Sequence, residues 1–213
     1  MTTQDLFEPQ GFYKEFKVAW KPQEGDQDGW GDLTPHPKED DYGPNLTKTI
    51  EQAMIRLARR HDLYCQNIEQ KIRKESVEQE WMNVDHVIIG GDRTYRRFPL
   101  IAVEHETGFI ASKLGRLVDG KQTTASFEWA LWKVLTMRAR LSVFIAYPEE
   151  SQRDLAKWVV GEIAGGWCET YASLGWKPNT LLLMGWKNQK DSASDLYEPF
   201  RIDDKGRMVE LDR

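Results

Sequence analysis

Nine residues decide the fold class of this chain: FPLIAVEHE, residues 98–106. Their apolar side chains follow one another without the polar alternation of a half-exposed strand, which indicates a strand that is buried on both faces. Such strands lie at the centre of sheets that helices cover on both sides. The stretch therefore predicts a central strand of an α/β protein.

The segments around this strand alternate between helical and β-strand patterns. Apolar residues at steps of mostly three, four or seven predict one long helix over residues 46–73. We expect the last helix to end at Gly165-Gly166. The resulting order α-β-β-α-β-α-β predicts an α/β sheet with helices packed on its faces. The remaining elements are expected as strands over 81–89, 141–147 and 180–186 and as helices over 125–139 and 151–165.

Acidic residues are concentrated near the start of the chain. The 213 residues carry 34 acidic and 29 basic side chains, for a formal net charge of −5, and residues 1–45 hold ten of the acidic and four of the basic ones. Residues 21–45 are rich in Gly, Pro and Asp, which is typical of a loop. We therefore predict an acidic extension over 1–45, partly loop, and a single α/β domain over 46–213.

Several classes of protein are disfavoured by composition. No apolar run approaches the roughly 18 residues of a transmembrane helix, so no membrane partner is expected. The first residues lack the basic and apolar regions of a signal peptide. Only Cys65 and Cys168 occur, in no CxxC spacing, which argues against a disulfide framework and against a structural zinc site. The sequence predicts a cytoplasmic protein.

Carboxylates interrupt two of the predicted strands. Glu104 and Glu106 share one face of their strand and His105 lies on the other, because side chains alternate along a strand. Asp85 interrupts the preceding apolar strand, and the short connection between the two strands predicts that they are neighbours. Clustered carboxylates with raised pKa values suit a hard cation such as Mg²⁺. The alternative is that each acid pairs with an arginine, for which Arg93, Arg96 and Arg97 are close in sequence.

Residues 46–147 resemble the PD-(D/E)XK nuclease superfamily, whose core is a small mixed sheet flanked by helices. The resemblance rests on Asp85, on Glu104-His105-Glu106 at the end of an apolar strand, and on the helix and apolar strand that follow. The family motif has a lysine where this chain has Glu106, and some restriction endonucleases of the superfamily carry Glu-x-Glu there. Lys133 of the following helix, or else Lys113, is expected to supply the missing ammonium group.

The resemblance implies metal-dependent hydrolysis of phosphodiester bonds on a restriction-endonuclease-like fold. Asp85 and Glu104 would hold Mg²⁺ or Mn²⁺, together with Glu51 or, as a second choice, Glu69. Glu106 or a lysine would orient or deprotonate the attacking water. The expected substrate is DNA, and a chain that cuts both strands would act as a homodimer. The DNA backbone would be held by arginine side chains, namely Arg56, Arg60, Arg93, Arg96 and Arg97.

Two other functions are compatible with the same residues. A nuclease-fold protein that has lost catalysis would act as a nucleic-acid-binding or protein-binding regulatory module, which the missing motif lysine favours. A carboxylate metal site could also serve another hydrolysis.

Outside the site, the sequence predicts His86 and His105 as core residues and places four tryptophans in the core, namely Trp129, Trp132, Trp158 and Trp186.

Overall fold

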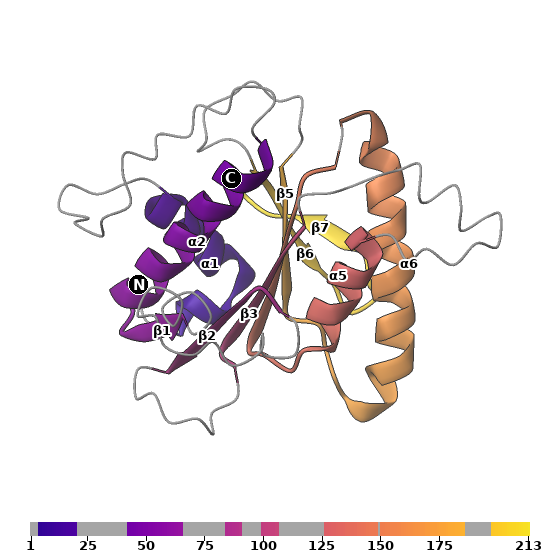
Figure 1. The fold of residues 1–213 in the computed structure, drawn as a ribbon. Helices are drawn as coiled ribbons and strands as arrows, with labels where there is room; N and C mark the ends of the chain where they lie inside the picture. Colours follow the sequence, from indigo (N-terminus) through magenta and orange to yellow (C-terminus); the bar gives the residue numbers. More distant parts are fainter. Residues whose placement is uncertain are drawn as a thin grey trace.

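A mixed sheet of seven strands forms the centre of the protein in the computed structural model, with helices on both of its faces (Figure 1). The strands follow one another across the sheet in the order of the sequence, from β1 to β7. The protein therefore has the α/β fold class that the sequence predicts. The structure describes residues 4–20, 42–65, 84–90, 99–106, 126–148, 150–185 and 197–213.

The sheet has a parallel centre between two antiparallel ends. β3 pairs in parallel with β4, and β4 pairs in parallel with β5. The pairs β1–β2, β2–β3, β5–β6 and β6–β7 are antiparallel. The strands are β1 (Leu63–Cys65), β2 (His86–Gly90), β3 (Ile101–Glu106), β4 (Leu141–Ala146), β5 (Thr180–Gly185), β6 (Tyr197–Ile202) and β7 (Met208–Glu210).

Within the described residues, four α-helices cover the sheet, two on each face (Figure 1). α1 (Pro9–Trp20) and α2 (Tyr42–Arg60) pack against each other on one face. α5 (Ser126–Thr136) and α6 (Arg153–Tyr171) cover the other face and provide the crossovers that parallel strands require. Short 3₁₀ turns are η1 (Asp5–Phe7), η3 (Glu150–Gln152) and η4 (Ala172–Leu174). Among these described helices, none combines the length and apolar character needed to cross a bilayer.

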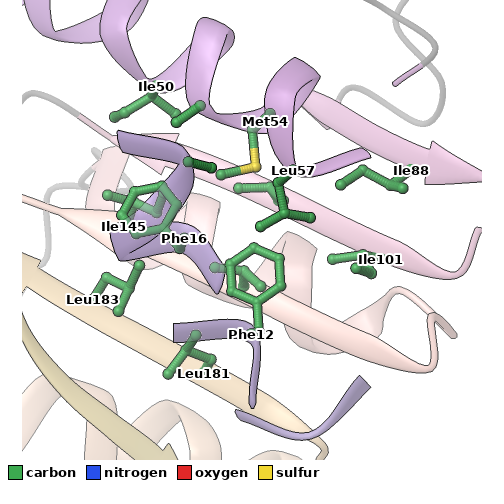
Figure 2. Packing of buried hydrophobic residues seen from close by; sticks show 14 of the residues in the cluster. Phe12, Phe16, Ile50, Met54, Leu57, Ile88, Ile101, Ile145, Leu181 and Leu183 are labelled. Carbon is green, nitrogen blue, oxygen red and sulfur yellow. The ribbon is translucent and has the colours of Figure 1, made fainter. Parts of the chain in front are cut away.

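The larger hydrophobic cluster fills the space between the sheet and the helices α1 and α2 (Figure 2). α2 contributes apolar residues at helical spacing, α1 contributes two phenylalanines among others, and β3, β4 and β5 contribute every second residue. This face is therefore closed by apolar packing. Figure 2 labels the following members: Phe12, Phe16, Ile50, Met54, Leu57, Ile88, Ile101, Ile145, Leu181 and Leu183.

A second cluster lies between the sheet and the helices α5 and α6. The alternate strand residues Phe144 and Leu182 meet Leu131 of α5 and Val160 of α6, and all four side chains are buried. The parallel strands thus bury both of their faces, which explains why their sequences are apolar without interruption. The prediction that residues 98–106 contain a central strand is confirmed, because β3 lies between β2 and β4.

The helix predicted over 46–73 is wrong in its length. α2 ends at Arg60, and Asp62 adopts a left-handed backbone conformation with φ 54°. Leu63–Cys65 then pairs with β2 as an additional strand. Apolar residues at steps of three and four continued past Arg60 in the sequence, but helical spacing does not reveal where a turn with positive φ ends the helix. The rest of the predicted helix, residues 66–73, lies outside the described residues.

The expected end of α6 at Gly165-Gly166 is also wrong, because the helix continues to Tyr171. A glycine inside a helix costs only about 1 kcal/mol, and buried residues on both sides of the pair, including Val160 and Cys168, hold this helix against the sheet. The turn between β6 and β7 approaches the helix here. A side chain at Gly206, whose φ is 79°, would come within 2.3 Å of the Gly165 nitrogen, so this turn requires glycine.

Residues 4–20 are part of the core. We placed them in an acidic extension, but η1 and α1 bury Leu6, Phe12 and Phe16 in the same cluster as α2 and the sheet. The acidic residues of this region do not indicate whether its apolar side chains are buried. The predicted loop is described only at its C-terminal end, where α2 begins at Tyr42. β6 and β7, which the sequence analysis did not predict, complete the other end of the sheet.

Three of the four tryptophans predicted for the core are exposed. Trp129 and Trp132 of α5 are 49% and 48% exposed, and Trp158 of α6 is 59% exposed. Phe127 and Leu131 occupy the inner face of α5, which leaves the outer face to the two tryptophans. Their rings stack on each other with centroids 5.0 Å apart. Trp186 lies outside the described residues.

Candidate functional site

Asp85 and Glu104 lie side by side where β2 begins and β3 approaches its end. β2 and β3 are antiparallel neighbours, with His86 opposite Val103, and Asp85 lies in the bend immediately before β2. The backbone N–H of Asp85 donates to Oε2 of Glu104 at 3.4 Å. The backbone N–H of His105 donates to Oδ2 of Asp85 at 2.8 Å. The predicted pairing of the two strands, which brings the two carboxylates together, is confirmed.

Lys133 completes this group from α5. Its Nζ forms an ion pair with Oε1 of Glu104, and the side chains of Lys133 and Glu104 are only 15% and 6% exposed. The two residues come from a helix and a strand that pack directly on each other. The structure therefore brings together three residues that the sequence analysis selected, Asp85, Glu104 and Lys133. Lys113 lies outside the described residues.

The electrostatics of Glu104 reflect this crowded environment. Burial raises the pKa of its carboxyl to about 7, and the negative charge of Asp85 adds to the rise. The hydrogen bond and the charge of Lys133, together with the Asp85 N–H, oppose it. Glu104 consequently titrates near neutral pH, and a further positive charge beside it would favour its ionised form.

The two histidines lie on the other face of the sheet, as predicted. The ring of His105 is edge-on to that of Tyr147, with centroids 5.4 Å apart, and burial lowers its pKa to about 4. His86 is opposite Val103, a member of the cluster under α1 and α2. Both side chains are therefore directed away from Glu104 and into the layer that α1 and α2 cover.

The other acidic candidates are placed less closely. Glu106 is half-buried at the end of β3, and strand alternation puts it on the face of Glu104. Glu51 belongs to α2, which covers the opposite face. Within the part of the chain that the structure describes, no three His, Cys, Asp or Glu residues form a group that could hold a metal ion. Glu69 lies outside that part.

The described arginines of the predicted nucleic-acid surface contact α1. Arg56 donates to the carbonyl oxygen of Ala19 at 2.9 Å and to Gln52 at 3.3 Å. Arg60 lies 3.6 Å from a carboxylate oxygen of Glu15. The contacts with Ala19 and Glu15 tie α2 to α1. The other three predicted contacts, Arg93, Arg96 and Arg97, lie outside the described residues.

A second buried carboxylate, which the sequence analysis missed, lies on β6. Glu198 is opposite Met184 of β5, at the sheet edge where β3 and β4 also end. Arg153 at the start of α6 and Arg213 each lie 2.5 Å from one of its carboxylate oxygens. The signal was present, because Glu198 interrupts the apolar residues of β6 as Asp85 interrupts those near β2.

Comparison of the chain with protein-family models, with curated proteins and with solved structures finds no match.

Proposed function

We propose that this protein is a metal-dependent nuclease that hydrolyses phosphodiester bonds in DNA. One observation carries the proposal: Asp85, Glu104 and Lys133 converge from the bend before β2, from β3 and from α5. These are the two acids of the nuclease motif and the lysine expected to replace its missing ammonium group. The antiparallel pair β2–β3, followed by a crossover helix and the parallel strand β4, supports a restriction-endonuclease-like core.

The donor chemistry of this group fits Mg²⁺ or Mn²⁺. Asp85 and Glu104 offer carboxylate oxygens, and each carboxylate accepts one backbone N–H across the strand pair: Oε2 of Glu104 from Asp85, and Oδ2 of Asp85 from His105. Mg²⁺ is commonly bound by one or two carboxylates and keeps several water ligands, so Glu51 is not required as a third ligand. The raised pKa of Glu104 also indicates that a cation bound beside this carboxyl would stabilise its ionised form. When bound, the metal would lower the pKa of a bound water and stabilise charge on the phosphate.

The side chains around the carboxylates would have distinct roles. Lys133 compensates the charge of Glu104 and supplies a positive group beside the phosphate as negative charge develops there. Glu106, on the same face as Glu104, would accept a proton from the attacking water. Arg93, Arg96 and Arg97 remain our candidates for contacts to the DNA backbone. A protein that cuts both strands would do so as a homodimer.

The alternative is a nuclease-fold protein that binds nucleic acid or another protein without catalysis. It is favoured by the ion pair itself, because Lys133 already occupies one carboxylate oxygen of Glu104. In that case Lys133 and Glu104 would stabilise the contact of α5 with β3, and no metal would be needed.

Cleavage of DNA in the presence of Mg²⁺ or Mn²⁺ tests the proposal. Supercoiled plasmid and single-stranded DNA would be incubated with the purified protein and with Asp85→Asn, Glu104→Gln and Lys133→Met. We expect metal-dependent cleavage that each substitution reduces by at least about a hundredfold, the usual size of the loss of one group that acts on the reacting atoms. Lys157→Met is the matched control, because Lys157 is exposed on the neighbouring helix α6.

Other results would decide against the nuclease. Cleavage that survives Asp85→Asn and Glu104→Gln would mean that the activity belongs to another site. Binding of DNA without cleavage, unaffected by either metal, would support the binding module. Isothermal titration calorimetry with Mn²⁺ separates the two outcomes, since the nuclease requires a metal that both substitutions weaken.

A further inference from the structure

A pocket of about 520 Å³ opens where α5 and α6 end and where β4 and β5 begin. Its wall includes Met137 after α5, Ser142 of β4 and Thr180 of β5. The carboxylate group lies farther along the sheet, because Glu104 is opposite Phe144 and strand residues rise about 3.3 Å each. Pockets of about 300–1,000 Å³ are typical of sites for small molecules and cofactors.

One wall of this pocket is a ladder of aromatic rings that ends in a guanidinium group. Trp167 and Tyr171 of α6 have ring centroids 5.0 Å apart, and Tyr171 stacks on Trp176 at 5.1 Å and 18°. Cζ of Arg138 lies 3.5 Å from the centroid of the Trp176 ring, a distance that is possible only when the guanidinium lies over the ring. All four side chains line the pocket.

Arg138 is therefore held flat on one side, and it is exposed to solvent. A guanidinium plane backed by an indole is a stacking platform for nucleic-acid bases, which pack on arginine planes as they do on aromatic rings. The ladder fixes the orientation of this plane before a ligand arrives, which lowers the entropy cost of binding.

The charged residues of the pocket indicate that the ligand also carries an anionic group. Among the described residues that line it, Arg138 and Lys177 are cationic and none is acidic. Lys177 is 73% exposed at its side chain and pairs with Asp204, so its ammonium group stays at the rim of the pocket. A planar ring would stack on the Arg138 plane, and an anionic group would bind Arg138 and share the Lys177 ammonium group with Asp204. These two features together describe a nucleotide.

We propose that this pocket binds a nucleoside monophosphate, with the base stacked on Arg138 and the phosphate close to Lys177. The ligand is either a free nucleotide or the terminal nucleotide of a single strand, since the two present the same chemistry. The proposal is independent of the nuclease, because neither Arg138 nor Lys177 belongs to the carboxylate group and no metal is involved.

Isothermal titration calorimetry of the full chain in EDTA, with AMP and with a 5′-phosphorylated oligo(dA), tests this site. We expect binding of at least one probe, and we expect Arg138→Ala to weaken it about tenfold through loss of stacking and charge. Arg138→Lys keeps the charge but not the plane, so it should recover only part of the affinity. Arg201→Ala is the matched control, because Arg201 is exposed on β6 and does not line the pocket.

The probes also identify the source of the nucleotide. Tighter binding of AMP would assign the site to free nucleotides, and tighter binding of the oligonucleotide would assign it to strand ends. Both results support the proposal when Arg138→Ala weakens them and Arg201→Ala does not. The proposal is overturned if neither probe binds at millimolar concentration, if Arg138→Ala binds as the unchanged protein does, or if adenosine without phosphate binds as tightly as AMP. Loss of DNA cleavage in Glu104→Gln would not alter any of these results.

Discussion

Glu104 and His105 are neighbours in β3, yet they point into opposite layers of the protein. Glu104 faces α5, where Lys133 pairs with it and Asp85 lies beside it. His105 faces the layer of α1 and α2, where its ring is edge-on to Tyr147. One layer compensates a buried charge with an opposite charge, whereas the other layer removes the charge by deprotonating the imidazole.

The difference shows which of the two neighbours can change its charge near neutral pH. Burial disfavours the charged form of both residues. It raises the pKa of Glu104 to about 7 and lowers the pKa of His105 to about 4. Near neutral pH the imidazole is neutral, while the carboxyl of Glu104 is close to its titration midpoint. Of these two residues, Glu104 is therefore the one whose charge can respond to a metal, a proton or a phosphate near neutral pH.

The largest expected effect concerns the pH dependence that Glu104 gives to stability. Its pKa is raised from 4.5 to about 7, so the folded protein holds this proton more tightly than the unfolded chain does. The contribution to stability is complete below pH 4.5 and is lost as the pH rises through 7. Relative to Glu104→Gln, the unchanged protein should lose about 3 kcal/mol of unfolding free energy over this range. Urea denaturation at a series of pH values measures the difference, with Glu162→Gln as an exposed control.

His105 should show the opposite slope. Its pKa is lowered from 6.5 to about 4, so its contribution to stability is present above pH 6.5 and is lost as the pH falls through 4. Relative to His105→Phe, the unchanged protein should lose about 3 kcal/mol on acidification. Phenylalanine keeps an edge-on contact with Tyr147 available. A difference between the two proteins that stays constant from pH 4 to 7 would show that His105 is not the neutral, buried group described here.

A smaller effect is expected from removing the charge that compensates Glu104. Lys133→Met should lower the unfolding free energy by about 2 kcal/mol at neutral pH, because a buried carboxylate then lacks its partner. The loss should shrink at pH 4.5, where Glu104 is protonated. Glu104→Gln/Lys133→Met should recover part of the loss, and the double-mutant cycle gives the coupling energy. A coupling of zero would mean that the ion pair does not persist in solution.

The site was more predictable from sequence than the edges of the fold. Asp85 and Glu104 stood out because an acid inside an apolar strand must find compensation. Their adjacency followed from the short connection between the strands. Glu198 carries the same signal, but it lies on β6, whose neighbouring sequence was not recognised as a strand. α1 was not predicted because the local charge of this region does not indicate which of its side chains the sheet buries. Packing against the sheet and α2 buries Phe12 and Phe16.

The tryptophans of α5 fall outside what periodicity can decide, and they give the smallest expected effect. Trp129→Gln or Trp132→Gln should cost less than about 1 kcal/mol, since each removes one exposed stacking contact. Phe127→Ala, on the inner face of the same helix, should cost at least about 3 kcal/mol because it leaves a cavity beside Phe144. Thermal and urea denaturation of the three variants measure both. Equal losses of unfolding free energy on the two faces of α5 would contradict the exposure of the tryptophans. Replacing a side chain costs about 3 kcal/mol only when that side chain is buried in the folded protein.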